Sequence, residues 1–339
     1  MKIVDNKKDA IQELKRISSR TNSEKNNNIN AIVDEILQEV KNHGDLAVEK
    51  FTKKFDGFMP NPMQVSPDDL EDAWDKTDSD LKRSLEVAHE RIKKFHEKEI
   101  PTSFILKGEH GDIVQRRWRP VNNAGIYIPG GRAAYPSTVL MNAIPAKVAG
   151  VKNILMVSPG NREGQINKTV LAAAHLSGIN KVFRIGGAQA IGALAFGTNQ
   201  INKVDVISGP GNIYVTTAKK LIYGSTGIDS LAGPSEILII ADETAHTTHI
   251  ASDLLAQAEH DPLASSILLT TSMNQAKEVL EELYRKIDDH PRKEICMESI
   301  KNWGLIVICD NYESCIELSN NFAPEHLEII AFDSKKILE

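Results

Sequence analysis

The chain has 339 residues, of which 41% are hydrophobic and 25% are charged, and its formal net charge is −6. This composition is typical of globular proteins, and the length predicts about two domains. The mild negative charge argues against nucleic acid as the main partner, because nucleic-acid binding usually requires a basic surface. The N-terminus has no signal peptide, and no segment approaches the ~20 apolar residues that span a bilayer. We therefore expect a cytoplasmic protein with neither a nucleic-acid nor a membrane partner.

Secondary structure is predicted from the spacing of apolar residues. Residues 1–99 carry them at helical spacing, apart from an Asn-rich segment at 22–30 that predicts a linker or a helix lead-in. From 125 to 223 the chain repeats a short apolar strand, a glycine-containing loop and a helix, and a second alternation occupies 229–339. Strands alternating with helices predict the α/β class, with parallel sheets covered by helices on both faces.

Glycines follow several of the predicted strands. Gly186-Gly187 and Gly209-Pro210-Gly211 stand where a strand ends and a helix begins. In parallel sheets this edge binds ligands, and free N–H groups at a helix start attract phosphate. A dinucleotide site is therefore one interpretation, but Tyr214 replaces the third glycine of the standard fingerprint. Ordinary tight turns between strand and helix explain the same glycines.

The segment 251–262 predicts a helix that continues up to Pro262, because proline cannot extend a helix. Asp253, Gln257 and His260 then share one side at spacings of four and three residues. Gln257 and His260 offer an oxygen and a nitrogen donor that suit zinc, although two donors form only part of its shell. A polar helix end facing solvent would have the same spacing.

Glu325 and His326 are neighbours after Pro324 and before an apolar strand. Both are possible proton carriers near neutral pH. Adjacent side chains of an extended strand point to opposite faces, so a shared pocket requires irregular backbone, which Pro324 permits. An exposed strand start is the alternative. Ser235 stands at another loop-to-strand junction, where it could donate a hydrogen bond to a ligand or be an ordinary turn residue.

Seven segments, taken in order, resemble motifs of the histidinol dehydrogenase family, which catalyses the last two oxidations of histidine biosynthesis. They are residues 125–131, 136–141, 186–191, 209–212, 232–236, 257–260 and 324–327. The resemblance extends from the N-terminal helices to residue 339. Seven ordered motifs are far more specific than any one of them.

The resemblance implies two Rossmann-like domains with parallel-type sheets flanked by helices, plus an N-terminal helical arm at 1–21. The first domain would be discontinuous, formed by 22–126 and 235–339, and would carry the metal and substrate residues. Residues 127–234 would be inserted as the NAD-binding domain. The family also implies a homodimer.

The implied reaction oxidises L-histidinol to L-histidine with two NAD, through a bound histidinal. In the family, NAD contacts match Tyr127, Gln189 and Asn212. Substrate contacts match Ser235, Gln257, His260 and His326, and the ligands of one zinc ion per active site match Gln257 and His260. His326 would accept the hydroxyl proton, which requires a neutral imidazole, and Glu325 would activate the water that attacks the aldehyde.

The family's zinc site also takes an aspartate and a second histidine from a C-terminal segment beyond Glu339, and the histidine comes from the partner subunit. With two ligands in place of four, we expect weak zinc binding, a weakened dimer and impaired turnover. Alternatives are an inactive binding or scaffold protein that still binds NAD, an aldehyde dehydrogenase-like enzyme, and a zinc hydrolase that needs no NAD. An aldehyde dehydrogenase-like enzyme would need a reactive cysteine. Instead, the spacing and odd number of Cys296, Cys309 and Cys315 predict reduced thiols that serve packing.

Overall fold

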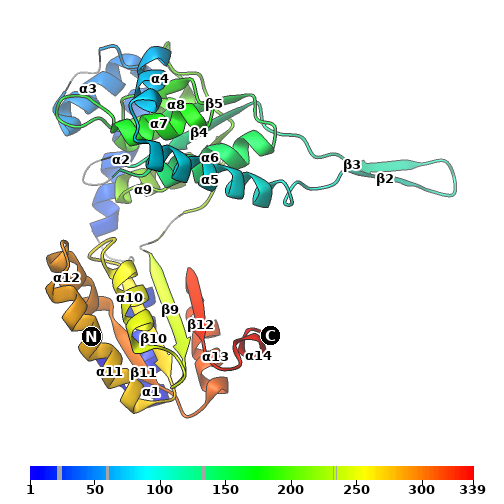
Figure 1. Ribbon diagram of the computed structural model, residues 1–339. Coiled ribbons are helices and arrows are strands. Elements are labelled where there is room, and N and C mark those ends of the chain that lie inside the picture. The colour runs from blue at the N-terminus through cyan, green and yellow to red at the C-terminus, as the bar shows by residue number, and fades with distance from the viewer. Residues whose placement is uncertain (21–24, 59–60, 131–133, 232, 234) are drawn as a thin grey trace. The chain divides into compact units, whose positions relative to one another are not determined.

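The computed structural model describes residues 1–20, 25–58, 61–130, 134–231, 233 and 235–339 (Figure 1). The chain forms two compact units. We call residues 1–26 and 232–339 the terminal unit, and residues 27–231 the central unit. Each unit has a parallel sheet with helices on both faces, which confirms the predicted α/β class with two Rossmann-like domains.

The sheet of the terminal unit has, within the described residues, five parallel strands in the order β1-β11-β10-β9-β12. The strands are β1 (Lys2–Val4), β9 (Glu236–Ala241), β10 (Ser265–Thr270), β11 (Leu305–Ile308) and β12 (His326–Ile330). One face is covered by α10 (Thr247–Ala258), α11 (Met273–Asp288) and α12 (Lys293–Trp303). The other is covered by α1 (Lys7–Ser18) and α13 (Tyr312–Phe322), and α14 (Ser334–Leu338) follows β12.

Local sequence explains these elements. All six residues of β10 are buried, as expected for a central strand covered on both faces. Helix α1 begins where the Asn6 side chain accepts a hydrogen bond from the Asp9 amide. Its buried residues, Ala10, Leu14 and Ile17, recur at helical spacing and face the sheet.

The sheet of the central unit also has five parallel strands among the described residues, in the order β6-β5-β4-β7-β8. They are β4 (Asn123–Tyr127), β5 (Asn153–Val157), β6 (Lys181–Phe183), β7 (Val206–Ser208) and β8 (Gly227–Ile228). One face carries α2 (Lys25–His43), α3 (Asp45–Asp56), α8 (Gly187–Phe196) and α9 (Ile213–Ile222). The other carries α4 (Pro67–Asp75), α5 (Ser79–His96), α6 (Pro136–Val148) and α7 (Lys168–Leu176).

Two further strands, β2 (Phe104–Lys107) and β3 (Ile113–Arg116), form a separate antiparallel ribbon that projects from the central unit (Figure 1). The spacing of apolar residues did not predict it. Among the described residues, no helix is long and apolar enough to cross a bilayer.

The units differ from the predicted domain segments at three places. Residues 27–126 belong with the central unit, because α2 to α5 complete its two cores. Leu37 and Val40, for example, pack so closely on α8 that a Cβ at Gly192 would lie 3.2 Å from the Leu37 side chain. The predicted N-terminal arm is part of the terminal unit, because β1 pairs with β11. The predicted linker at 22–30 is helical from Lys25, and its residues 22–24 lie outside the described part of the chain.

Candidate active site

Glu325 and His326 are held by the backbone of one residue, Glu236. The Glu236 amide donates to Glu325 Oε2 at 3.2 Å, and the Glu236 carbonyl lies 3.1 Å from His326 Nδ1. The two side chains approach each other, with 3.7 Å between Glu325 Oε2 and His326 Nδ1. Adjacent side chains of an extended strand would point to opposite faces, but Glu325 precedes β12 and only His326 belongs to the strand, so the two side chains can lie on the same side.

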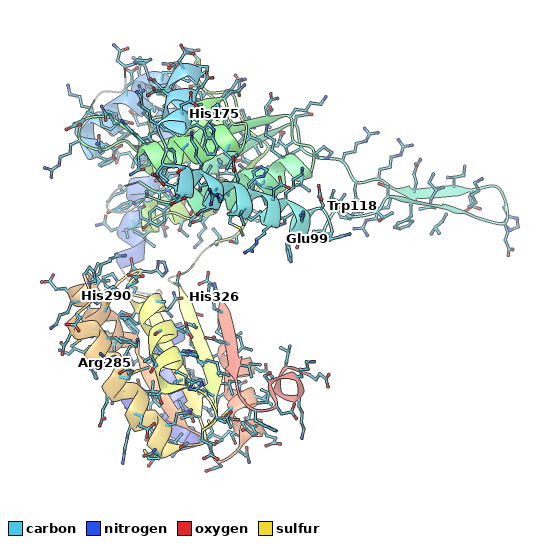
Figure 2. All side chains as sticks on the ribbon, viewed as in Figure 1. Glu99, Trp118, His175, Arg285, His290 and His326 are labelled. Carbon is cyan, nitrogen blue, oxygen red and sulfur yellow. The ribbon has the colours of Figure 1, made fainter. Side chains whose placement is uncertain are left out.

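This arrangement also selects the protonated nitrogen of His326. A carbonyl can only accept a hydrogen bond, so the contact with Glu236 requires the proton on Nδ1. In the neutral imidazole the lone pair is then on Nε2, which is free to act as a base. His326 is exposed at one end of the terminal-unit sheet (Figure 2).

Glu236 is itself held by Arg20, which follows α1. Arg20 Nη1 lies 2.8 Å from Glu236 Oε1, and the guanidinium also donates to the carbonyls of Ile17 and Leu263 at 2.8 Å each. The Arg20 side chain is 1% exposed. No sequence motif pointed to Arg20, because it is far from Glu236 along the chain.

Gln257 and His260 lie near the same edge of the sheet. Helix α10 connects the parallel strands β9 and β10, so it runs back toward the strand starts. The Leu254 carbonyl of α10 accepts a hydrogen bond from Ser266 Oγ at 2.8 Å, and Ser266 is in register with Ile237 and, through it, with His326. Gln257 is three residues, about 4.5 Å, farther along α10, so it lies near the level of His326.

The expectation that the helix reaches Pro262 is wrong. Helix α10 ends at Ala258, and His260 follows in a turn in which its amide donates to the Gln257 carbonyl. His290, in the connection between α11 and α12, contacts this turn, because its Nε2 lies 3.3 Å from Glu259 Oε2.

The donor set at this turn suits a metal only in part. Gln257 is buried and its amide Nε2 has no hydrogen-bond partner, whereas His260 is exposed. Within the described ranges, no group of three or more His, Cys, Asp or Glu side chains could hold a metal ion. Gln257 and His260 thus offer two donors, and zinc would need the remainder of its shell from other groups.

Ser235 is the residue before β9, directly beside Glu236. Its carbonyl accepts a hydrogen bond from the Ser265 amide at 3.1 Å, and the residue is half-buried. It therefore stands at the same edge as Glu325 and His326. This edge is the amino-terminal one, whereas open α/β sheets usually bind ligands at their carboxyl ends.

The other candidate residues gather at the carboxyl edge of the central-unit sheet. Tyr127 ends β4, Gln189 lies in the first turn of α8, and Asn212 caps α9 by accepting from two backbone amides. The Tyr127 hydroxyl accepts a hydrogen bond from the Gly187 amide at 3.2 Å. Gln189 is 1% exposed, and neither atom of its amide has a partner. An unpaired buried amide costs free energy, which a ligand that hydrogen-bonds to it would recover.

The loop that carries Asn212 is held tightly against Tyr127. Gly209 has a φ of +111°, and a Cβ there would lie 2.1 Å from the Tyr127 carbonyl oxygen. Its amide donates to Asp229, and its carbonyl accepts from Lys219, which is buried and paired with Asp229. This close backbone approach fixes the loop that carries Asn212 against the end of β4, so Asn212 and Tyr127 lie at the same edge.

Asp56, at the end of α3, is a further polar group near Tyr127. Its Oδ2 is buried without a partner, and burial raises the pKa of this carboxyl to about 6. Burial also raises the pKa of Tyr127 to about 12, with a smaller contribution from the Asp56 charge. In the sequence, Asp56 is one of many charged residues in a predicted helical region and belongs to no motif, so sequence reasoning missed it.

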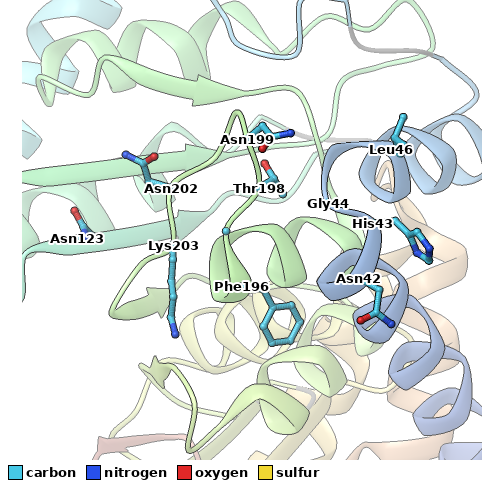
Figure 3. A pocket seen from close by; sticks show the side chains of 11 residues that line it. Asn42, His43, Gly44, Leu46, Asn123, Phe196, Thr198, Asn199, Asn202 and Lys203 are labelled. Carbon is cyan, nitrogen blue, oxygen red and sulfur yellow. The ribbon is translucent and has the colours of Figure 1, made fainter.

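A surface hollow of about 930 Å³ lies elsewhere in the central unit (Figure 3). It is lined by Asn123, His43 and Lys203, among others. Asn123 begins β4 and Tyr127 ends it, so the hollow is at the opposite edge from the glycine loops. It contains none of the predicted site residues.

The three cysteines are all buried, and burial, followed by the Glu259 charge, raises the pKa of Cys296. None is therefore an exposed nucleophile of the kind that an aldehyde dehydrogenase-like mechanism requires.

The two parallel sheets with helices on both faces define an α/β protein of the Rossmann-like class, with glycine loops at the carboxyl edge of one sheet and a Glu-His pair at the amino edge of the other. The family model for histidinol dehydrogenase matches residues 19–339. A histidinol dehydrogenase of Prochlorococcus marinus strain MIT 9312 is 87% identical over all 339 residues, which cover 77% of that protein. The enzyme of P. marinus subsp. pastoris (strain CCMP1986) is 76% identical, again over all 339 residues and 79% of its length. The crystal structure of histidinol dehydrogenase from Elizabethkingia anophelis is 40% identical with a TM-score of 0.86, covering 90% of this chain and 71% of that one.

The chain belongs to the histidinol dehydrogenase family. It is thus an oxidoreductase of histidine biosynthesis, and nothing in these comparisons favours the alternative functions.

Proposed function

We propose that the chain oxidises L-histidinol to L-histidine through bound histidinal, as an NAD-dependent, zinc-assisted enzyme of the cytoplasm that acts as a homodimer. The observation that carries the assignment of catalytic residues is the shared anchoring of Glu325 and His326 on the Glu236 backbone. It directs a base and a carboxylate to one edge of the sheet.

His326 would take the proton of the substrate hydroxyl on Nε2, because its Nδ1 proton is committed to the Glu236 carbonyl. Glu325 would then take a proton from the water that attacks the aldehyde. Its carboxylate oxygen is fixed by the Glu236 amide, which keeps it beside His326. Ser235 would hydrogen-bond the substrate from the same edge.

Tyr127, Gln189 and Asn212 would hold NAD, which supplies the electron acceptor for both oxidations. The unpaired amide of buried Gln189 and the close approach of Gly209 support this placement. Gln257 and His260 would hold zinc, which supplies an anchor for the imidazole and amine of the substrate. Their two donors leave room in the shell for the substrate nitrogens.

The test is NADH formation, followed by absorbance, with L-histidinol, NAD⁺ and added zinc. We expect two NADH per histidinol. Glu325→Gln should slow oxidation of histidinal more than oxidation of histidinol, because only the aldehyde step needs an activated water. Glu317→Gln is the matched control, since that carboxylate is exposed on α13 and pairs only with Lys7 in the described contacts. Equal loss in both half-reactions would refute the role of Glu325.

A further inference from the structure

A largely buried ion pair binds both backbone polar groups of Gly209. Lys219 Nζ donates to the Gly209 carbonyl at 3.1 Å, and the Gly209 amide donates to Asp229 Oδ2 at 2.8 Å. Lys219 also pairs with Asp229 Oδ1, so the three residues form a closed ring of contacts. Gly209 begins the loop 209–212 between β7 and α9, and we call Lys219 and Asp229 the loop clamp.

The fold places both clamp residues beside the loop. Ile207 of β7 is in register with Ile228 of β8, so Asp229 follows β8 at the end of β7. There the Asp229 amide donates to the Ile207 carbonyl at 3.1 Å. Lys219 lies in the second turn of α9, and long side chains of helices lean toward the helix start. Its ammonium group therefore reaches back to the loop that precedes the helix.

The burial of the clamp indicates that it acts on the loop and not on a ligand. The Lys219 side chain is 4% exposed, so its ammonium group is closed off from a bound phosphate. Desolvation offsets most of the attraction within a buried ion pair, so such a pair adds little net stability. It can instead favour the one backbone conformation that satisfies both charges, which here is the conformation of Gly209.

The loop 209–212 requires such a constraint because it contains two glycines. Glycine adopts many backbone conformations, and only one of them places Gly209 at a φ of +111° against Tyr127. The path is equally tight at Gly211, where a Cβ would lie 2.3 Å from the Val215 side chain. Asn212 follows directly and caps α9, so the conformation of Gly209 sets the position of the Asn212 side chain.

We infer that Lys219 and Asp229 are positioning residues that fix the loop 209–212 in its NAD-binding conformation before the cofactor binds. The inference rests on the proposed NAD site and adds two residues that act on NAD only through the loop. Without the clamp, the loop would hold this conformation for a fraction of the time. The apparent affinity for NAD would then fall in proportion to that fraction.

The test compares Lys219→Met with Lys220→Met, which makes the same substitution at the next, exposed residue of α9. A further variant combines Lys219→Met with Asp229→Asn, so that no unpaired charge remains to destabilise the fold. Calorimetry gives the Kd for NAD, and NADH formation gives the KM for NAD and for L-histidinol. In both Lys219 variants we expect the Kd and KM for NAD to rise about 10-fold, as for a loop that is competent about a tenth of the time. The KM for L-histidinol should stay near that of the wild type, as should all values for Lys220→Met.

Hydrogen exchange of the wild type supplies a measurement that needs no variant. Amides of 209–212 should be protected without NAD, and they should exchange faster in the Lys219 variants. Protection that appears in the wild type only when NAD is added would overturn the inference, because the loop would then be ordered by the cofactor. Unchanged NAD affinity in the folded double variant would overturn it as well, while the proposed NAD site would stand. A wild type that binds no NAD would refute the site itself, and the positioning role with it.

Discussion

Replacing Arg20 with methionine tests whether the N-terminal segment positions the Glu-His pair. Methionine retains an apolar stem but removes the donors to Glu236, Ile17 and Leu263. Because Arg20 is 1% exposed and Glu236 is 20% exposed, the change leaves a largely buried carboxylate without its cation. Removing one partner of a buried pair costs about 3–5 kcal/mol, and we expect about 3 kcal/mol here because Glu236 retains some contact with water.

The assay is urea unfolding together with steady-state kinetics. Arg16→Met is the control, because Arg16 is 45% exposed and its contacts with Glu13, the Asn302 carbonyl and the Trp303 ring stay partly solvated, so it should lose less stability than Arg20→Met. Adding Glu236→Gln to Arg20→Met should recover part of the lost stability, since no carboxylate then remains unpaired. In folded Arg20→Met, kcat should fall ~10-fold or more, because the Glu236 backbone holds both Glu325 and His326.

Two results would refute this reasoning. One is an Arg20→Met variant as stable as Arg16→Met, which would mean that the buried pair contributes little. The other is a folded Arg20→Met variant with unchanged kcat, which would mean that the Glu236 backbone keeps its position without Arg20.

Three further predictions concern the two candidate sites. Asp56→Asn should raise the free energy of unfolding at pH 8 by about 1–2 kcal/mol, a value discounted because the side chain is only half-buried. Burial raises the pKa of Asp56 from 3.8 to about 6 in the folded state, so its negative charge destabilises the fold increasingly as the pH rises between these values. The stability gained by Asp56→Asn should therefore vanish below pH 4 in urea titrations. Gly209→Ala should lose more stability and NAD affinity than Gly224→Ala, since both have positive φ but a Cβ at Gly224 meets nothing within 4 Å; equal losses would show that the contact with Tyr127 is unimportant. Calorimetric titration with zinc should give weaker binding to Gln257→Ala and His260→Ala than to the wild type, and unaltered affinity would exclude these ligands.

The α/β class and several elements followed from the sequence because their causes are local. The alternation of strand, loop and helix predicted for 125–223 is present from β4 to α9. Helix α6 begins with Pro136 in its first turn, and β5 is a short apolar run with four buried residues, so both follow from local sequence. The seven ordered motifs indicated the family, which the comparisons confirmed. The roles of Glu325, His326, Gln257 and His260 stay predictions.

Tertiary structure decided what depends on contacts between distant residues. The Arg20–Glu236 pair joins residues 216 positions apart, and no local pattern records it. Residues 27–126 group with the central unit and not with 235–339, and helical spacing could not show this because it indicates which face of a helix is apolar but not which sheet it covers. The end of α10 at Ala258 was missed because a turn can precede a proline by several residues. The sequence thus determined the family and the local elements, and the tertiary structure decided which backbone holds the Glu-His pair, because packing between segments far apart in the chain sets that geometry.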